Sequence, residues 1–185
     1  PLLLHQRDLR LQLVDAAPDP APVYLQLLFA RPARADSAGL PREPQSHPLQ
    51  PGEAVLELRE FDLGAWGILL AEDESGAVGG AAVSAGARVY PLDYFQRDDL
   101  TVLWDIRVRE DVRGRGIGTQ LFASAAAWAR DRGYRQLGIE TQNVNVPACR
   151  FYARQGCRLG AIHRFGYAGR PDVAHEAMLL WYFDL

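Results

Sequence analysis

Residues 101–141 read TVLWDIRVREDVRGRGIGTQLFASAAAWARDRGYRQLGIET, and three patterns follow one another in this stretch. Residues 101–108 are rich in apolar and β-branched side chains, which predicts a strand. Apolar side chains then recur at helical spacing from Ile117 to Ala129, and Gly133 is placed to end that helix. A second predicted strand, residues 134–141, follows. Such a strand–helix–strand unit predicts two parallel strands joined by a right-handed crossover.

Three glycines separate the first predicted strand from the helix. Gly114, Gly116 and Gly118 have neither the G-x-G-x-x-G spacing of a dinucleotide-binding turn nor the Gly-Lys-Ser/Thr of a Walker loop. A purely structural turn needs only one or two glycines. The other alternative is a backbone cradle for an anion, in which the helix dipole attracts negative charge and Arg113 and Arg115 add positive charge. The residues favour this anion site over the structural turn.

The rest of the chain completes a mixed α/β pattern. Residues 31–52, rich in Pro, Ser, Gly and charge, predict a long loop, whereas residues 53–61 fit either a helix or a strand. A second helix is predicted within residues 143–157, with Asn145 as its N-cap and Gly156 at its carboxyl end. Further strands are predicted at residues 9–14, 23–29, 67–73, 77–86, 158–165 and 176–185. We therefore expect a single domain, residues 1–185, built on one twisted sheet.

Composition limits the possible functions. The chain has 185 residues and a formal net charge of −3, which argues against non-specific nucleic-acid binding. It has no run of eighteen apolar residues, so no membrane span or membrane partner is expected, and we expect a cytoplasmic location. Cys149 and Cys157 have no metal or disulfide spacing and are expected to be reduced thiols. The four histidines show no metal-ligand spacing either, so no metal is predicted, and the four tryptophans are expected to pack in the core.

Two segments resemble the signatures of the GNAT superfamily of N-acetyltransferases. The sequence RGRGIG, residues 113–118, is similar to the family signature [Q/R]-x-x-G-x-[G/A]. The second signature, N-x-x-A-x-x-x-Y-x-x-x-G-F, resembles residues 145–157, except that Cys157 stands where Phe is usual. The resemblance covers roughly residues 67–185. It implies the acyl-CoA N-acyltransferase fold, a twisted, mostly antiparallel mixed sheet with one splayed parallel pair and flanking helices.

A narrower resemblance, to the streptothricin acetyltransferases, is carried by residues 140–160 and 176–185. These segments read ETQNVNVPACRFYARQGCRLG and EAMLLWYFDL, and Val144 stands where that group tends to have another Asn. The resemblance implies transfer of an acetyl group from acetyl-CoA to a primary amine of a small cationic molecule such as streptothricin. One alternative acceptor is a protein N-terminal or lysine amine, as in ribosomal-protein acetyltransferases. The other alternative is a coenzyme A-binding module without turnover.

The resemblance also implies where the co-substrate binds. Acetyl-CoA would lie between the two splayed strands, its pantetheine arm paired with the backbone of residues 106–108 and its diphosphate on the amides of residues 114–119. The implied binding residues are Ile106, Arg107, Val108, Arg113, Gly114, Arg115, Gly116, Ile117, Gly118, Thr119, Asn145, Ala148 and Tyr152. A homodimer formed through exposed edges of the sheet is a further expectation.

Three side chains are implied in catalysis. By resemblance, Tyr152 protonates the departing coenzyme thiolate; the alternative is a core tyrosine on an amphipathic helix. Asp105 and Glu140 lie on the two predicted strands that flank the site. Either carboxylate could accept a proton from the amine or attract its positive charge. The alternative for each is an ion pair with an arginine on the surface.

Overall fold

The computed structural model describes residues 9–13, 65–86, 95 and 97–185. The predicted strand at residues 23–29, the predicted loop at residues 31–52 and the ambiguous segment at residues 53–61 lie outside these ranges. The described elements are β1 (Arg10–Leu13), β2 (Gly67–Asp73), β3 (Gly76–Val83), β4 (Leu100–Val108), the 3-10 turn η4 (Glu110–Val112), α3 (Ile117–Asp131), β5 (Gln136–Gln142), α4 (Val146–Arg154), β6 (Arg158–His163) and β7 (Met178–Asp184).

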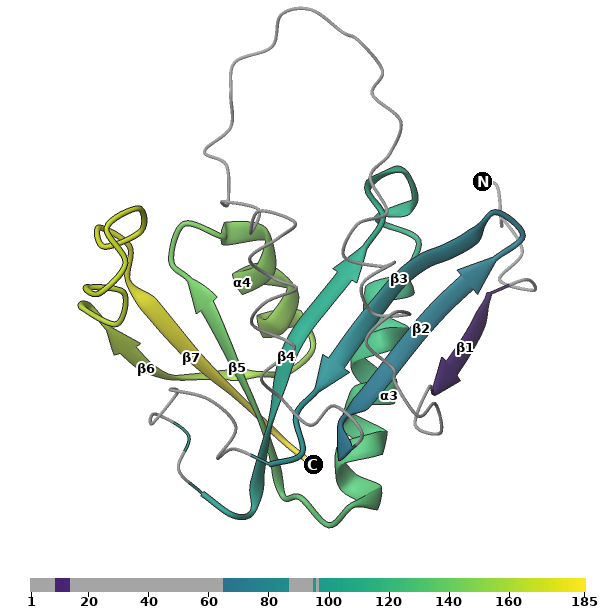
Figure 1. Cartoon of the computed structure of the whole chain (residues 1–185), viewed down its shortest axis with the longest axis horizontal. Helices are drawn as coiled ribbons and strands as arrows, with labels where there is room; N and C mark the ends of the chain where they lie inside the picture. The colour runs from purple at the N-terminus through teal and green to yellow at the C-terminus, as the bar shows by residue number, and fades with distance from the viewer. Residues whose placement is uncertain (1–8, 14–64, 87–94, 96) are drawn as a thin grey trace, which may run out of the picture.

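The strands form one mixed sheet in the order β1-β2-β3-β4-β5-β7-β6 (Figure 1). Among these pairs only β4 and β5 run parallel, and α3 connects them. The remaining pairs are antiparallel, including the β2–β3 hairpin that the sequence predicts. The prediction of a twisted, mostly antiparallel sheet with one parallel pair is therefore confirmed.

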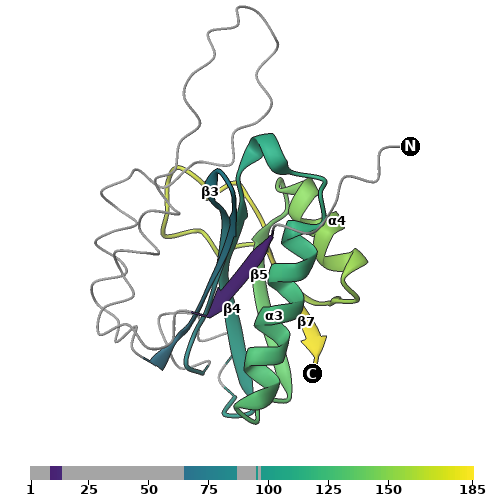
Figure 2. The same ribbon diagram turned by 90° about the vertical axis from the view of Figure 1, so that its right-hand side faces the viewer.

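The two described helices, α3 and α4, cover the same face of the sheet (Figure 2). Adjacent residues of a strand point to opposite faces, and the two apolar clusters follow this rule. Leu103 lies in the main cluster, which also holds the buried side of α3, whereas Val102 lies in a second cluster on the other face. On β7, Trp181 belongs to the main cluster and Leu180 to the second. The sheet thus has one face covered by α3 and α4 and an opposite face that holds the second cluster.

A glycine allows α3 to approach the sheet closely. A Cβ atom at Gly67 would lie 2.5 Å from the ring of Trp128, which is buried on α3. Three of the four tryptophans, Trp66, Trp128 and Trp181, are buried as predicted. Trp104 is half-buried and makes an edge contact with Trp66, with ring centroids 5.5 Å apart.

The way α3 ends explains why β5 starts later than the sequence predicts. The predicted strand at residues 134–141 begins only at Gln136. Gly133 has a φ of 82°, and the Tyr134 amide donates to the Ala129 carbonyl at 3.1 Å. These are features of a helix termination in which a left-handed glycine turns the chain away from the axis. Tyr134 therefore belongs to the end of the helix and not to the strand.

Candidate active site

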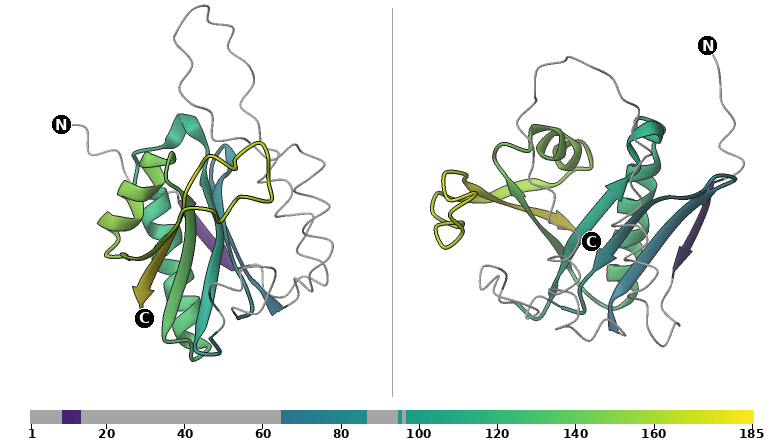
Figure 3. Two further views of the ribbon diagram at one scale, coloured as in Figure 1. Left: turned by 90° about the vertical axis from the view of Figure 1, so that its left-hand side faces the viewer. Right: turned by 45° about the horizontal axis from the view of Figure 1, so that its top comes forward.

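The parallel strands β4 and β5 separate after a short paired segment. Residues 100–102 pair with residues 136–138, and beyond them the two strands no longer pair with each other. We call the segments that no longer pair with each other, residues 103–108 of β4 and 139–142 of β5, the strand fork. Figures 1 and 3 show the two strands diverging toward α4. On its other side β4 remains paired, because residues 106–108 lie opposite residues 79–81 of β3. One backbone edge of β4 is therefore available to a ligand at the fork.

The glycine-rich turn brings the start of α3 to the end of β4. Gly114 and Gly116 have φ values of 79° and 82°, a region that side chains other than glycine rarely adopt. Gly116 is the N-cap of α3, and no side chain caps the helix. The first amides of a helix have no partner inside it. The amides that follow Gly116 are therefore left for an external acceptor.

Arginines surround this turn. Arg113 and Arg115 are exposed, and the Arg113 Nε donates to the Val108 carbonyl at 3.2 Å. The positive charge of Arg115 contributes to lowering the pKa of Asp111, although the hydrogen bond from Arg109 is the larger cause. Backbone amides at a helix N-terminus with flanking guanidinium groups form the arrangement that binds a phosphate or diphosphate.

Arg109 is a site-supporting residue that the sequence analysis missed. Its guanidinium group donates to both carboxylate oxygens of Asp111, at 2.6 and 3.0 Å. It also donates to the Ser75 hydroxyl at 3.0 Å, in the turn between β2 and β3. Arg109 thus ties the start of the glycine turn to a hairpin more than thirty residues away. In the sequence, the Arg109–x–Asp111 spacing could have indicated the contact with Asp111, but no pattern could have indicated the contact with Ser75.

The second predicted helix begins as expected. The Asn145 side chain accepts a hydrogen bond from the Ala148 amide at 3.3 Å, which confirms the predicted N-cap. Gly156 follows the helix with a φ of 91°. The two helices touch near their functional ends, because a Cβ at Gly118 would lie 3.4 Å from Phe151. Gln155 also donates to the Thr119 hydroxyl at 3.4 Å. The glycine turn and α4 are therefore held next to each other.

Tyr152 is buried on the inner side of α4. Its ring packs against Phe122 and Phe151, with centroids 6.3 and 5.3 Å away. Burial raises the pKa of the Tyr152 hydroxyl, and the nearby negative charge of Asp105 raises it further. Within the described ranges no hydrogen bond to this hydroxyl is found, and no fully buried polar side-chain atom lacks a partner. The Tyr152 oxygen is therefore not fully enclosed by protein, and its raised pKa keeps the hydroxyl protonated at neutral pH.

Asp105 lies on β4 within the strand fork. Its carboxylate forms an ion pair with the Arg107 Nε at 2.9 Å, and 19% of its side chain is exposed. The predicted alternative of an arginine partner therefore applies to Asp105. Its charge nevertheless acts on Tyr152, so the two groups lie within electrostatic range.

Glu140 lies on β5, just beyond the paired segment. Burial raises the pKa of its carboxyl group, while a hydrogen bond from the Tyr167 hydroxyl and the charge of Arg170 act in the opposite direction. Glu140 also contributes to the raised pKa of Tyr152. The structure thus brings the three predicted catalytic residues together at the fork. Tyr167 is a neighbour that the sequence analysis did not predict.

The Cys157 thiol lies within electrostatic range of Tyr152 but is not a candidate nucleophile. Burial raises the pKa of the Cys157 thiol to about 12, so it is protonated and unreactive at neutral pH. In the parts of the chain that the structure describes, no three His, Cys, Asp or Glu residues are grouped to hold a metal ion. Likewise, neither α3 nor α4 has the length and apolar character needed to cross a membrane.

Comparisons with known proteins concern the family and the fold of the chain. Residues 36–157 match the model of the acetyltransferase (GNAT) family. The chain is 40% identical over 86 residues to a streptothricin acetyltransferase from Escherichia coli, a match that covers 46% of this chain and 49% of that protein. It is 38% identical over 79 residues to streptothricin acetyltransferase A of Bacillus subtilis (strain 168), covering 43% and 45%. The chain therefore spans about half the length of the curated relatives it matches.

A solved structure is also similar. It is that of a candidate streptothricin acetyltransferase from Bacillus anthracis str. Ames in complex with acetyl coenzyme A. The two chains superimpose with a TM-score of 0.58 and are 25% identical, and the match covers 69% of this chain and 67% of that one.

Proposed function

The chain belongs to the acetyltransferase (GNAT) family, and we propose that it transfers an acetyl group from acetyl-CoA to a primary amine of a small cationic molecule. One observation carries this proposal. The uncapped N-terminus of α3 lies at the end of the open edge of β4, and the Tyr152 hydroxyl and two carboxylates lie at the same strand fork.

The residues present fit the co-substrate. A coenzyme A diphosphate needs several donors in a small space, and the amides after Gly116 supply them without a competing cap. Neither Gly114 nor Gly116 has a neighbouring atom within 4 Å of the position that a Cβ would occupy. The pantetheine amides need an extended partner, and residues 106–108 of β4 offer their open edge. Arg113 and Arg115 add the charge that a diphosphate requires.

Acetyl-CoA supplies a thioester, which is already reactive toward a neutral amine. The protein must therefore orient the amine, remove its proton and protonate the departing sulfur. Tyr152 donates that last proton, because its raised pKa keeps the hydroxyl protonated. Its apolar contacts with Phe122 and Phe151 hold the ring in one orientation.

Asp105 and Glu140 act on the acceptor side. Two carboxylates at the fork attract a cationic amine and stabilise it in the site. Glu140 is the better proton acceptor of the two. Asp105 is already paired with Arg107, whereas burial raises the pKa of Glu140 toward that of a general base.

We take streptothricin as the acceptor to test first. The relatives from Escherichia coli and Bacillus subtilis that match residues of this chain are streptothricin acetyltransferases. The acidic residues at the fork are consistent with a positively charged acceptor such as streptothricin.

Thiol release from acetyl-CoA, measured with streptothricin, simple polyamines and peptides in parallel, tests this function. Turnover with streptothricin and none with peptides supports the proposed acceptor. Turnover with peptides alone would replace it by a protein acetyltransferase. Binding of acetyl-CoA without turnover on any amine would favour a non-catalytic binding module.

A further inference from the structure

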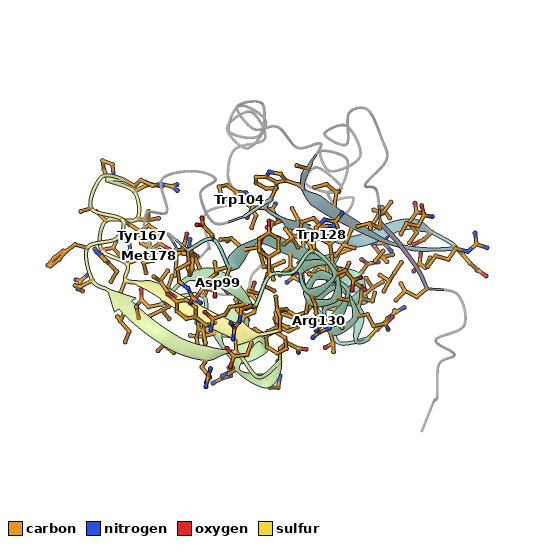
Figure 4. The ribbon with its side chains drawn as sticks, turned by 90° about the horizontal axis from the view of Figure 1, so that it is seen from below. Asp99, Trp104, Trp128, Arg130, Tyr167 and Met178 are labelled. Atoms are coloured by element: carbon orange, nitrogen blue, oxygen red, sulfur yellow. The ribbon has the colours of Figure 1, made fainter. Side chains whose placement is uncertain are left out.

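Tyr167 lies in the connection between β6 and β7, on the sheet face opposite the helices. Its ring is 6% exposed and packs in the second apolar cluster. Figure 4 shows it beside Met178 and well away from Trp128 on α3. Its hydroxyl donates a hydrogen bond to Oε1 of Glu140 on β5. A residue outside both family signatures therefore contacts the proposed base directly.

The contact leaves one carboxylate oxygen of Glu140 unused. The described residues give Glu140 no hydrogen bond other than the one from Tyr167. No fully buried polar side-chain atom in the described ranges lacks a partner, so Oε2 is open to solvent or to a ligand. Because Oε1 is held by a rigid phenol, the direction of Oε2 is restricted.

The β6–β7 connection is fixed against the end of β5. The Asn143 side chain accepts from the Ala177 amide at 2.6 Å, and the Asn143 amide donates to the Ala177 carbonyl at 2.9 Å. Arg164 also donates to the His175 carbonyl at 3.1 Å, which closes the connection on itself. The Tyr167–Glu140 hydrogen bond is therefore supported by a well-bonded backbone on both sides.

We propose that Tyr167 is a positioning residue for the acetyl acceptor. Its hydroxyl holds Oε1 of Glu140, keeps the carboxylate charged and leaves Oε2 to receive the acceptor amine. This role deepens the function proposed above and rests on it.

The charges around Glu140 set the direction of the expected effect. Burial raises the pKa of Glu140, and the Tyr167 hydrogen bond is the largest influence that lowers it, followed by the charge of Arg170. The other titratable groups nearby are Asp105 and Tyr152, at the strand fork, and Glu176, which lies near Tyr167. Replacing Tyr167 by Phe removes only the lowering hydrogen bond. The Glu140 pKa should then rise, so that the carboxylate protonates at a higher pH than in the wild type.

The first measurement needs no activity. In protein labelled with ¹³C at the glutamate carboxyl carbons, the Glu140 signal is assigned from its loss in Glu140→Gln and then followed through a pH titration. We expect Tyr167→Phe to move the Glu140 midpoint to higher pH. Tyr182→Phe is the matched control, because Tyr182 packs at the edge of the same cluster, 5.6 Å from Phe95, without bonding Glu140. An unchanged Glu140 midpoint in Tyr167→Phe would overturn the proposal.

The second measurement follows kcat against pH at saturating acceptor. We expect Tyr167→Phe to move the acid limb to higher pH, with kcat on that limb reduced about tenfold, the size expected for one hydrogen bond to a charged group. Tyr182→Phe should keep the wild-type profile. A shifted Glu140 midpoint with an unshifted kcat profile would also overturn the positioning role.

If the proposed function itself is wrong, these experiments give a different set of results. If wild-type protein transfers no acetyl group, or if Glu140→Gln keeps the wild-type kcat profile, the role given to Glu140 is wrong whatever Tyr167 does. If Glu140→Gln abolishes the acid limb while Tyr167→Phe leaves it in place, only the inference about Tyr167 fails.

Discussion

The proton that leaves with the coenzyme sulfur is assigned to one hydroxyl, that of Tyr152. Thiolates are good leaving groups, and a neighbouring acid of high pKa gives up its proton only as charge develops on sulfur. The surroundings of Tyr152 suit this timing, since burial and the charge of Asp105 both disfavour the phenolate.

Removing this hydroxyl should slow turnover without disturbing the fold. We expect Tyr152→Phe to lower kcat by about 100-fold, the lower end of the range for general acid catalysis, with acetyl-CoA affinity nearly unchanged. The aromatic contacts to Phe122 and Phe151 remain in this variant. Steady-state kinetics with a binding titration separates the two quantities.

In the wild type, kcat should not fall near pH 10, because the Tyr152 pKa lies above the ordinary value for tyrosine. A loss of activity centred at or below pH 10 that is absent in Tyr152→Phe would contradict the raised pKa. A Tyr152→Phe variant with wild-type kcat at every pH would contradict the assignment of the acid.

Gly116 offers a second test at the level of one residue. Its φ of 82° should make Gly116→Ala cost about 1–2 kcal/mol of stability, as for any left-handed alanine. The added methyl would also stand among the amides proposed to bind the diphosphate. We therefore expect a clear loss of acetyl-CoA affinity, measured by calorimetric titration at a temperature where both variants are folded.

Gly133 provides the matched control at the other end of α3. It has the same φ of 82°, and like Gly116 it has no atom within 4 Å of an added Cβ. Gly133→Ala should lose similar stability and keep full affinity for acetyl-CoA. Equal losses of affinity in the two variants would mean that the Gly116 effect reflects general strain and not the binding site.

Among the elements, α3 has the central structural role, because it places the glycine turn and packs on β2, β3 and β4. Its close approach depends on Gly67, where a Cβ would lie 2.5 Å from Trp128. We expect Gly67→Ala to lower the free energy of unfolding by about 1–3 kcal/mol, the usual cost of overpacking. Gly169→Ala should change it by less than about 0.5 kcal/mol, since nothing lies within 4 Å of that position. Denaturant unfolding of both variants makes the comparison, and equal stabilities would contradict this packing.

Local patterns predicted most of the described elements. The β2–β3 hairpin, both helices, the Asn145 cap and the parallel β4–β5 pair depend on periodicity and on Gly, Asn and Pro positions, which the sequence displays directly. The point at which β4 and β5 stop pairing could not be predicted, because it depends on tertiary packing and no local pattern marks it. The same holds for the Tyr167–Glu140 contact, which joins residues 27 positions apart and has no signature.

At the scale of the whole molecule, the described side chains distribute their charge unevenly around the proposed site. The net charge is −3, yet Arg113 and Arg115 are exposed together at the start of α3, while the carboxylates of Asp105 and Glu140 lie at the fork. An anionic co-substrate and a cationic acceptor would thus each meet opposite charge. This separation agrees with the transfer of an acetyl group between two oppositely charged molecules.

The uneven charge predicts a salt dependence. Affinity for acetyl-CoA should fall as ionic strength rises, because exposed charges are screened. Replacing Arg113 and Arg115 together by Gln should weaken binding about tenfold and flatten this dependence. Arg132→Gln is the control, since Arg132 stacks on Trp128, 4.0 Å from the ring centre, at the far end of α3. A double variant with wild-type affinity and salt slope would exclude a role for these two arginines.

The most direct measurement is an amide NMR titration of the ¹⁵N-labelled protein with acetyl-CoA. The amides of residues 114–119 should shift most, those of residues 106–108 should follow, and those around Gly133 should stay in place. Shifts concentrated elsewhere, with residues 114–119 unaffected at saturation, would contradict the proposed site.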